Sequence, residues 1–274
     1  MIALYNSTMT DHPSDEMLRK SGVFICALLI SIGTISCGKA SSEPVDRGAA
    51  RPVKDTIAES DAFYAQRADL VKVRQAIVAL RQAQADDSTN YDLAWRLSKY
   101  NYYLGAHTPE STEQAKAFHD GIEAGKLAVR IENNKADGHF WLGANYGGNA
   151  KLSMLPGLGE VDDIKNEMET VLKINEKYEL GSAYLGLGQV YLESPRILGG
   201  DVSKAISYLE QGIKIGPDNN KMRAKLAAAY AEAHRNDDAR KQIETIMSTK
   251  PLPDYRPEYD DAVAEAKKIR EKIK

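Results

Sequence analysis

Four histidines follow an N-terminal apolar segment, and histidine is the residue type best suited to metal binding or to acid–base chemistry. His107, His119, His139 and His234 form no pair at metal-ligand spacing with acidic neighbours, and no His-Glu-x-x-His motif occurs. His139 falls at a position of the repeat described below that lies within a helical hairpin, so we expect a buried histidine with satisfied hydrogen bonds. The sequence therefore predicts no metal site and no cofactor.

Nucleophilic and phosphate chemistry also lack their motifs. Gly121–Leu127 imitates a phosphate-binding loop, but it is one residue short, lacks the Ser/Thr and lies within a predicted helix. No Gly-x-Ser-x-Gly motif is present, and the chain's two cysteines precede residue 40. A catalytic site would have to draw on a short set of groove residues, namely Arg96, His139, Gln189 and Glu193. We therefore expect no catalytic residues and a protein that is not an enzyme.

The composition is that of an ordinary globular protein. The chain has 274 residues, is 43% hydrophobic and 27% charged, and carries a formal net charge of −3. It shows no basic stripe, which argues against a nucleic-acid partner.

The N-terminus resembles an export signal. An apolar run, Val23–Ile32, follows Arg19 and Lys20 and is shorter than the roughly 20 residues that span a bilayer. Acidic residues before Met17 do not suit such a signal. We therefore interpret residues 1–16 as an upstream extension from a misassigned start and residues 17–36 as a lipoprotein signal peptide.

The end of this segment resembles a bacterial lipobox. Small residues precede Cys37, which would carry the lipid after cleavage, and residues 37–55 would form a flexible tether. In that family, Gly38 in place of aspartate implies the outer rather than the inner membrane. The sequence thus predicts an exported, lipid-anchored protein that faces the periplasm. The alternative is an ordinary signal peptide with an incidental cysteine.

Downstream of the tether, apolar residues recur at helical spacing, as in Ile164, Met168 and Val171. A repeat is superimposed on this pattern: an apolar residue and a small residue are followed by an aromatic residue three positions on, and prolines end the units. One clean period of 34 residues separates Pro217 from Pro251. The predicted repeat-core residues are Trp95, Leu142, Gly143, Tyr146, Leu187, Gly188, Tyr191, Ala205, Pro217, Leu226, Tyr230, Ala239 and Pro251.

This spacing resembles the tetratricopeptide repeat (TPR). The resemblance implies one all-α domain over residues 56–274, a right-handed superhelix of about four hairpins with N-terminal helices before them. The expected hairpins are residues 89–134, 136–178, 180–217 and 220–251, with a capping helix over 257–273. Asp201 is the expected N-cap of one helix.

Three segments resemble a narrower family, the TatT lipoproteins associated with TRAP transporters. They are residues 94–105, 138–145 and 195–201. The resemblance implies a non-catalytic protein that forms a homo-oligomer around a ligand-conducting cavity and works with a periplasmic substrate-binding protein.

The repeat register also predicts an apolar inner groove, formed by the first helix of each hairpin. Its expected residues are Leu93, Arg96, Tyr100, Tyr103, Phe140, Ala144, Leu185, Gln189 and Leu192, continued by Lys221, Ala224, Ala228 and Glu232. An exposed apolar surface of this extent is typical of an interaction site. We expect a small hydrophobic or amphiphilic ligand there. The alternatives are a scaffold that holds an envelope protein's peptide or helix, and a groove filled by the insertion at residues 149–161, around Met154–Leu158.

Overall fold

Helices form every regular element of the described chain. The computed structural model describes residues 51–152 and 158–273, so the predicted signal peptide, Cys37 and most of the tether lie outside the described residues. The described residues belong to one compact unit. Its α-helices are α1 (Val53–Tyr64), α2 (Leu70–Asp86), α3 (Tyr91–His107), α4 (Ser111–Ile131), α5 (Ala136–Leu152), α6 (Leu158–Asn175), α7 (Ser182–Glu193), α8 (Val202–Ile215), α9 (Asn220–Glu232), α10 (Asn236–Ser248) and α11 (Arg256–Lys272), with short 3₁₀ helices η1 (Arg196–Leu198) and η2 (Pro253–Tyr255).

Short polar side chains fix where several helices begin. Asp69, Asn90 and Asn219 each accept a hydrogen bond from a backbone N–H in the first turn of α2, α3 and α9. Asp201 does the same for α8, accepting from Lys204 N at 3.0 Å, which confirms its predicted role as an N-cap.

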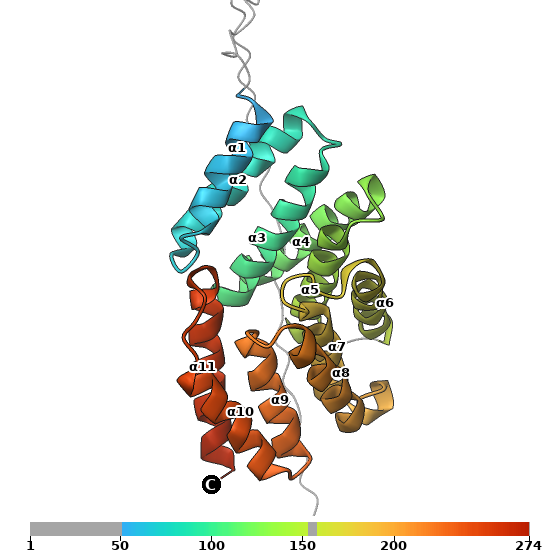
Figure 1. The fold of residues 1–274 in the computed structure, drawn as a ribbon. Coiled ribbons are helices and arrows are strands. Elements are labelled where there is room, and N and C mark those ends of the chain that lie inside the picture. The colour runs from blue at the N-terminus through green and yellow to red at the C-terminus, as the bar shows by residue number, and fades with distance from the viewer. Residues whose placement is uncertain (1–50, 153–157, 274) are drawn as a thin grey trace, which may run out of the picture. The chain divides into compact units, whose positions relative to one another are not determined.

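Successive helices pair as antiparallel hairpins, and the hairpins stack (Figure 1). The odd-numbered helices contact one another in sequence, α1 with α3, α3 with α5, and so on to α9 with α11. They form an inner row, while α2, α4, α6, α8 and α10 pack behind it. This arrangement is an all-α TPR superhelix, as predicted.

Close helix contacts depend on the small residues of the repeat. A Cβ added at Gly188 of α7 would lie 2.5 Å from Leu209 Cγ of α8. Leu142, Leu187, Leu226, Ala205, Ala239 and Tyr230 are buried. Tyr191 of α7 stacks on Tyr208 of α8 with ring centroids 5.5 Å apart, and Lys165 Nζ of α6 lies 5.0 Å from its ring centroid, so Tyr191 contacts both its own hairpin and the preceding one.

The ring of Phe118 in α4 fixes the spacing of the first two hairpins. It lies against Gly105 of α3 and Gly148 of α5, where an added Cβ would meet ring carbons at 2.8 and 2.1 Å. Asn145, fully buried in α5, donates to both the backbone and the hydroxyl of Ser98 in α3. Both an aromatic ring and a buried hydrogen-bonded amide therefore hold α3, α4 and α5 together.

Helix α4 is the longest of the described helices, with 21 residues. Of the insertion at residues 149–161, residues 149–152 belong to α5 and residues 158–161 to α6. Residues 153–157 lie outside the described part of the chain, and with them most of the Met154–Leu158 segment that was an alternative occupant of the groove. Over residues 51–152 and 158–273, no helix has the length and apolarity needed to cross a bilayer.

Candidate functional site

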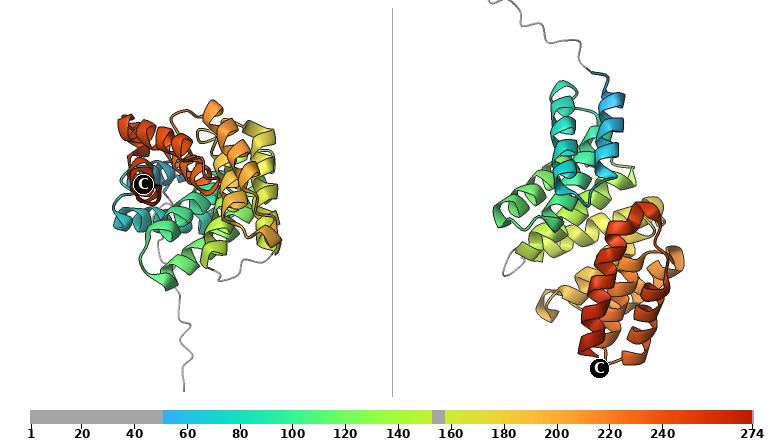
Figure 2. Two further views of the ribbon diagram at one scale, coloured as in Figure 1. Left: turned by 90° about the horizontal axis from the view of Figure 1, so that it is seen from below. Right: turned by 90° about the vertical axis from the view of Figure 1, so that its left-hand side faces the viewer.

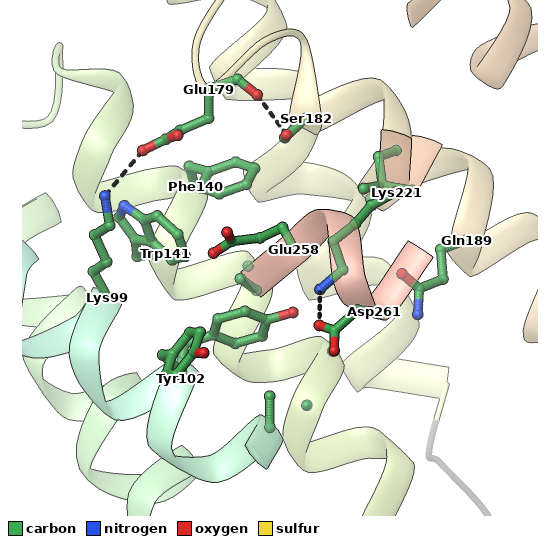
Figure 3. A pocket seen from close by; sticks show the side chains of 18 of the residues that line it. Lys99, Tyr102, Phe140, Trp141, Glu179, Ser182, Gln189, Lys221, Glu258 and Asp261 are labelled. Atoms are coloured by element: carbon green, nitrogen blue, oxygen red, sulfur yellow. Dashed lines mark hydrogen bonds and ion pairs between the residues drawn. The ribbon is translucent and has the colours of Figure 1, made fainter. Parts of the chain in front are cut away.

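A cavity of about 1110 Å³ lies along the inner row of helices (Figure 3). Residues of α3, α5, α7, α9 and α11 make up most of its lining. Helices α1, α4 and α6, the α1–α2 turn and the segments before α7, α9 and α11 also contribute to it. Ligand sites typically have volumes of roughly 300–1,000 Å³, so this space suffices for a small molecule of considerable size.

Aromatic side chains form the wall on the α3 and α5 side. Trp141 lies edge-on to Phe140, with centroids 4.8 Å apart, and 5.7 Å from Tyr102. Trp141 Nε1 donates to Tyr178 Oη at 3.0 Å, so the indole has its polar atom satisfied and presents its apolar surface. This wall offers rigid apolar area at little cost in side-chain entropy.

Ion pairs form the opposite wall, between α9 and α11. Lys221 Nζ lies 3.3 Å from Asp261 Oδ2, and Lys225 Nζ lies 2.8 Å from Glu265 Oε1 and 3.1 Å from Glu193 Oε1. Burial lowers the pKa of Lys225, but its two carboxylate partners outweigh burial and hold that pKa above its ordinary value. Burial raises the pKa of Asp261. Its hydrogen bond with His107 and the charge of Lys221 outweigh burial, so the pKa lies below its ordinary value. Lys225 and Asp261 are therefore charged at neutral pH.

The C-terminal helix closes one side of the groove. Arg67, in the α1–α2 turn, donates to both carboxylate oxygens of Glu258 at 2.9 and 2.6 Å and also to the backbone of Asp254. Figure 1 shows α11, in red, beside α9 with its first turn near the α1–α2 turn, and Figure 2 shows α11 from two further directions. The sequence predicts a capping helix over residues 257–273. In the structure, Glu258, Asp261 and Glu265 of this helix line the cavity.

A strained turn places a further carboxylate at the cavity. Glu179, Leu180 and Gly181 are consecutive residues with φ of 46°, 57° and 73°, a left-handed conformation that costs non-glycine residues energy. Asn219 Nδ2 holds the turn by donating to Leu180 O and Ser182 Oγ. The turn directs the Glu179 carboxylate to Lys99 of α3 and to the hydroxyl of Tyr255 beside α11.

Six of the nine predicted groove residues line the cavity and three do not. Leu93 is fully buried in the core formed with α2, Arg96 pairs with Asp61 and Asp92, and Leu192 packs against the C-terminal core. These three residues therefore do not contribute to the lining of this cavity. The six that line the cavity are Tyr100, Tyr103, Phe140, Ala144, Leu185 and Gln189.

In the fourth hairpin, only Lys221 of the predicted groove residues lines the cavity. Ala224 is fully buried, Ala228 packs in the core and Glu232 is exposed. Trp95, predicted as repeat core, is half-buried and lines the cavity, and its Nε1 donates to Asp92.

The side chains able to do chemistry do not converge. His139 is 5% exposed, and its ring nitrogens lie 2.6 Å from Glu167 Oε2 and 2.8 Å from Asn133 O, as expected of a satisfied buried histidine. Gln189 donates a hydrogen bond to Glu193. Arg96 does not line the cavity and pairs with Asp61. In the described residues, no group of three His, Cys, Asp or Glu side chains is arranged to hold a metal ion.

The arrangement defines a class: a helical-repeat protein whose stacked hairpins surround an inner cavity. Residues 196–266 match a tetratricopeptide repeat family model, and residues 56–187 match the model described as Regulator of microtubule dynamics protein 1-3. Residues 196–266 are therefore similar to tetratricopeptide repeats, and the fold of the described residues agrees with that repeat. No curated protein matches the sequence significantly.

Solved structures with a similar fold include three helical-repeat proteins. TTC0263, a thermophilic TPR protein in Thermus thermophilus, is 20% identical with a TM-score of 0.57, over 77% of this chain and 98% of that chain. MamA is 20% identical with a TM-score of 0.45, over 76% and 94%. A tetratricopeptide repeat protein from Parabacteroides merdae is 17% identical with a TM-score of 0.37, over 80% and 91%. The TTC0263 likeness supports the fold.

Proposed function

We propose that this protein is a non-catalytic, membrane-tethered TPR binding protein that holds a small apolar or amphiphilic ligand in its inner cavity. The observation that carries the proposal is the cavity itself. It combines an aromatic wall at Phe140 and Trp141 with charged groups on α9 and α11, a combination that suits a ligand with an apolar body and a polar end.

Native mass spectrometry of the full chain, purified in mild detergent, tests this proposal. We expect an additional small-molecule mass on the wild type. The substitution Ala144→Phe fills the apolar part of the cavity and should reduce the ligand-bound fraction of the protein at least tenfold. Ala115→Phe on the exposed face of α4 should leave that fraction unchanged. The proposal fails if the wild type carries no ligand, or if both variants retain it equally.

The cellular role that we propose follows from the N-terminal segment and from the TatT resemblance. A lipid on Cys37 would tether the domain to the outer membrane, facing the periplasm, and the protein would assist TRAP-type uptake together with a periplasmic substrate-binding protein. Residues 94–105, 138–145 and 195–201 support this role. Co-purification of the full chain with the substrate-binding protein of an adjacent TRAP operon is the expected result. Its absence, where such an operon exists, would contradict the role.

A protein-interaction scaffold for envelope assembly is the second candidate. The TPR match supports it, because stacked hairpins present extended concave surfaces to peptides and helices. The same mass spectra separate the two candidates: an empty cavity together with a stoichiometric envelope protein favours the scaffold.

A further inference from the structure

The cavity lining carries more negative than positive charge. Among the described residues that line it, eight are acidic and five are basic, and His107 adds a positive charge only when protonated. Asp61 is neutralised by Arg96, which lies outside the cavity, and an acidic excess remains after that pair is removed. A cleft lined with an excess of one sign attracts ligands of the other sign.

The carboxylates also have acceptor capacity to spare. Asp261 takes both of its contacts, from Lys221 Nζ and His107 Nε2, on Oδ2, and Glu265 takes its bond from Lys225 on Oε1. Within the described residues, Asp261 Oδ1 and Glu265 Oε2 have no hydrogen-bond partner. These oxygens can accept from a ligand without breaking an existing ion pair.

The side chain of Lys99 shows that the aromatic side of the cavity already holds an ammonium group. Its ammonium lies 5.1 Å from the ring centroid of Trp141 and 5.3 Å from that of Tyr64, and 3.1 Å from Glu179 Oε1. Aromatic faces and a carboxylate together stabilise an ammonium group. Figure 3 shows aromatic and acidic side chains together elsewhere in the cavity, with Glu258 between Phe140 and Tyr102 and Asp261 beside Lys221.

One feature of the cavity favours an anionic ligand, but its charge is smaller than that of the carboxylates beside it. The N-terminus of α9 lines the cavity, and a helix N-terminus is equivalent to roughly half a positive charge. Asp218, directly before the cap of α9, and Asp261, paired with Lys221, each carry a full negative charge beside it. An anion placed there would face both carboxylates.

We infer that the cavity selects a cationic amphiphile, an apolar chain or ring system that ends in a protonated amine, over a carboxylate or phosphate of the same size. Its ammonium group bonds to Asp261 and Glu265, and its apolar body lies along Phe140 and Trp141. This inference rests on the proposed ligand-binding function and specifies the charge of the ligand.

Three probes of equal chain length test the inference: octylammonium, octanol and octanoate. Both tryptophans of the chain, Trp95 and Trp141, line the cavity, so quenching of intrinsic fluorescence reports binding at this site. The protein is the full chain carrying Cys37→Ser, which removes the predicted lipidation site. We expect octylammonium to bind at least tenfold more tightly than octanoate, with octanol between them, and the ratio to shrink in high salt.

Matched variants assign the preference to named residues. Asp261→Asn combined with Glu265→Gln should bring the octylammonium-to-octanoate ratio close to one, and Glu244→Gln on the exposed face of α10 should leave the ratio unchanged. Circular dichroism tests whether the double variant is folded. If it is unfolded, Asp261→Asn alone replaces it and should lower the octylammonium-to-octanoate ratio by a smaller factor. Equal or tighter binding of octanoate, or a preference that survives in the variants, overturns the inference and leaves the proposed function standing. If none of the probes binds, the proposed function itself fails.

Discussion

Glu179 accepts a hydrogen bond from Lys99 Nζ at 3.1 Å, and the two residues lie 80 positions apart in the chain. The other carboxylate oxygen of Glu179 accepts from the Tyr255 hydroxyl at 2.9 Å. One side chain thus links α3 to the start of α11 across the cavity. The left-handed backbone at Glu179 and Leu180 makes this reach possible, and strain of this kind persists only where surrounding contacts determine it.

We predict that Glu179→Gln destabilises the protein by about 1–2 kcal/mol, because a partly buried charged hydrogen bond is lost. The side chains of Glu179 and Lys99 are only 21% and 20% exposed. Chemical denaturation followed by circular dichroism measures the effect. The matched control is Glu123→Gln, which removes the exposed pair with Lys126 and should cost less than about 0.5 kcal/mol. Equal costs for the two variants would contradict the role of Glu179 as a link.

Two adjacent glycines in α5 should respond in opposite directions to alanine. A Cβ on Gly147 meets nothing nearer than Ile164 Cδ1 at 4.0 Å, whereas a Cβ on Gly148 would lie 2.1 Å from a carbon of the Phe118 ring. Gly147→Ala should therefore stabilise the protein by about 0.5–1 kcal/mol through helix propensity. Gly148→Ala should destabilise it by about 1–3 kcal/mol, because Phe118 is also held against Gly105 and has little room to move. Thermal melts of the two variants test the pair. A loss of stability in both would show that α5 tolerates no added methyl group.

The repeat was predictable from sequence because its signals are local. Small residues such as Gly188 and Ala205, and the Pro217–Pro251 period, recur at fixed spacing and determine how neighbouring helices pack. The satisfied state of His139 was predictable for the same reason: its position in the repeat places it within a hairpin.

The cavity was only partly predictable because it depends on long-range contacts. Arg67 and Glu258 are separated by 191 positions, and no local pattern relates them. The spacing of Glu258, Asp261 and Glu265 is that of one helix face, and such a face is usually exposed to solvent. This face of α11 lines a cavity because α11 packs beside α9 and continues the inner row of helices. Leu93 shows the converse error, since an apolar residue near the inner face is buried against α2 instead.

The proposed lipid anchor predicts a distribution between membrane and soluble fractions. Wild-type protein labelled with a palmitate analogue should carry the label and sediment with membranes, because several acyl chains together hold stably. Cys37→Ala should abolish both the label and the sedimentation. Cys26→Ala, within the apolar run of the predicted signal, should alter neither. A labelled Cys37→Ala protein would refute the lipobox interpretation.

The contacts of His139 predict a defined dependence of stability on pH. Its hydrogen bond to Glu167 raises the pKa of His139 and outweighs burial, which lowers it. A raised pKa in the folded state stabilises the protein fully below the unfolded value of about 6.5, and this contribution is lost as the pH rises through the folded pKa. The unfolding free energy of the wild type should therefore exceed that of His139→Gln most at about pH 6, and the difference should shrink toward about pH 9. Urea denaturation at several pH values measures both proteins, with His119→Gln on the exposed face of α4 as the matched substitution. A difference that stays constant over this range would mean that the Glu167 contact involves the neutral imidazole.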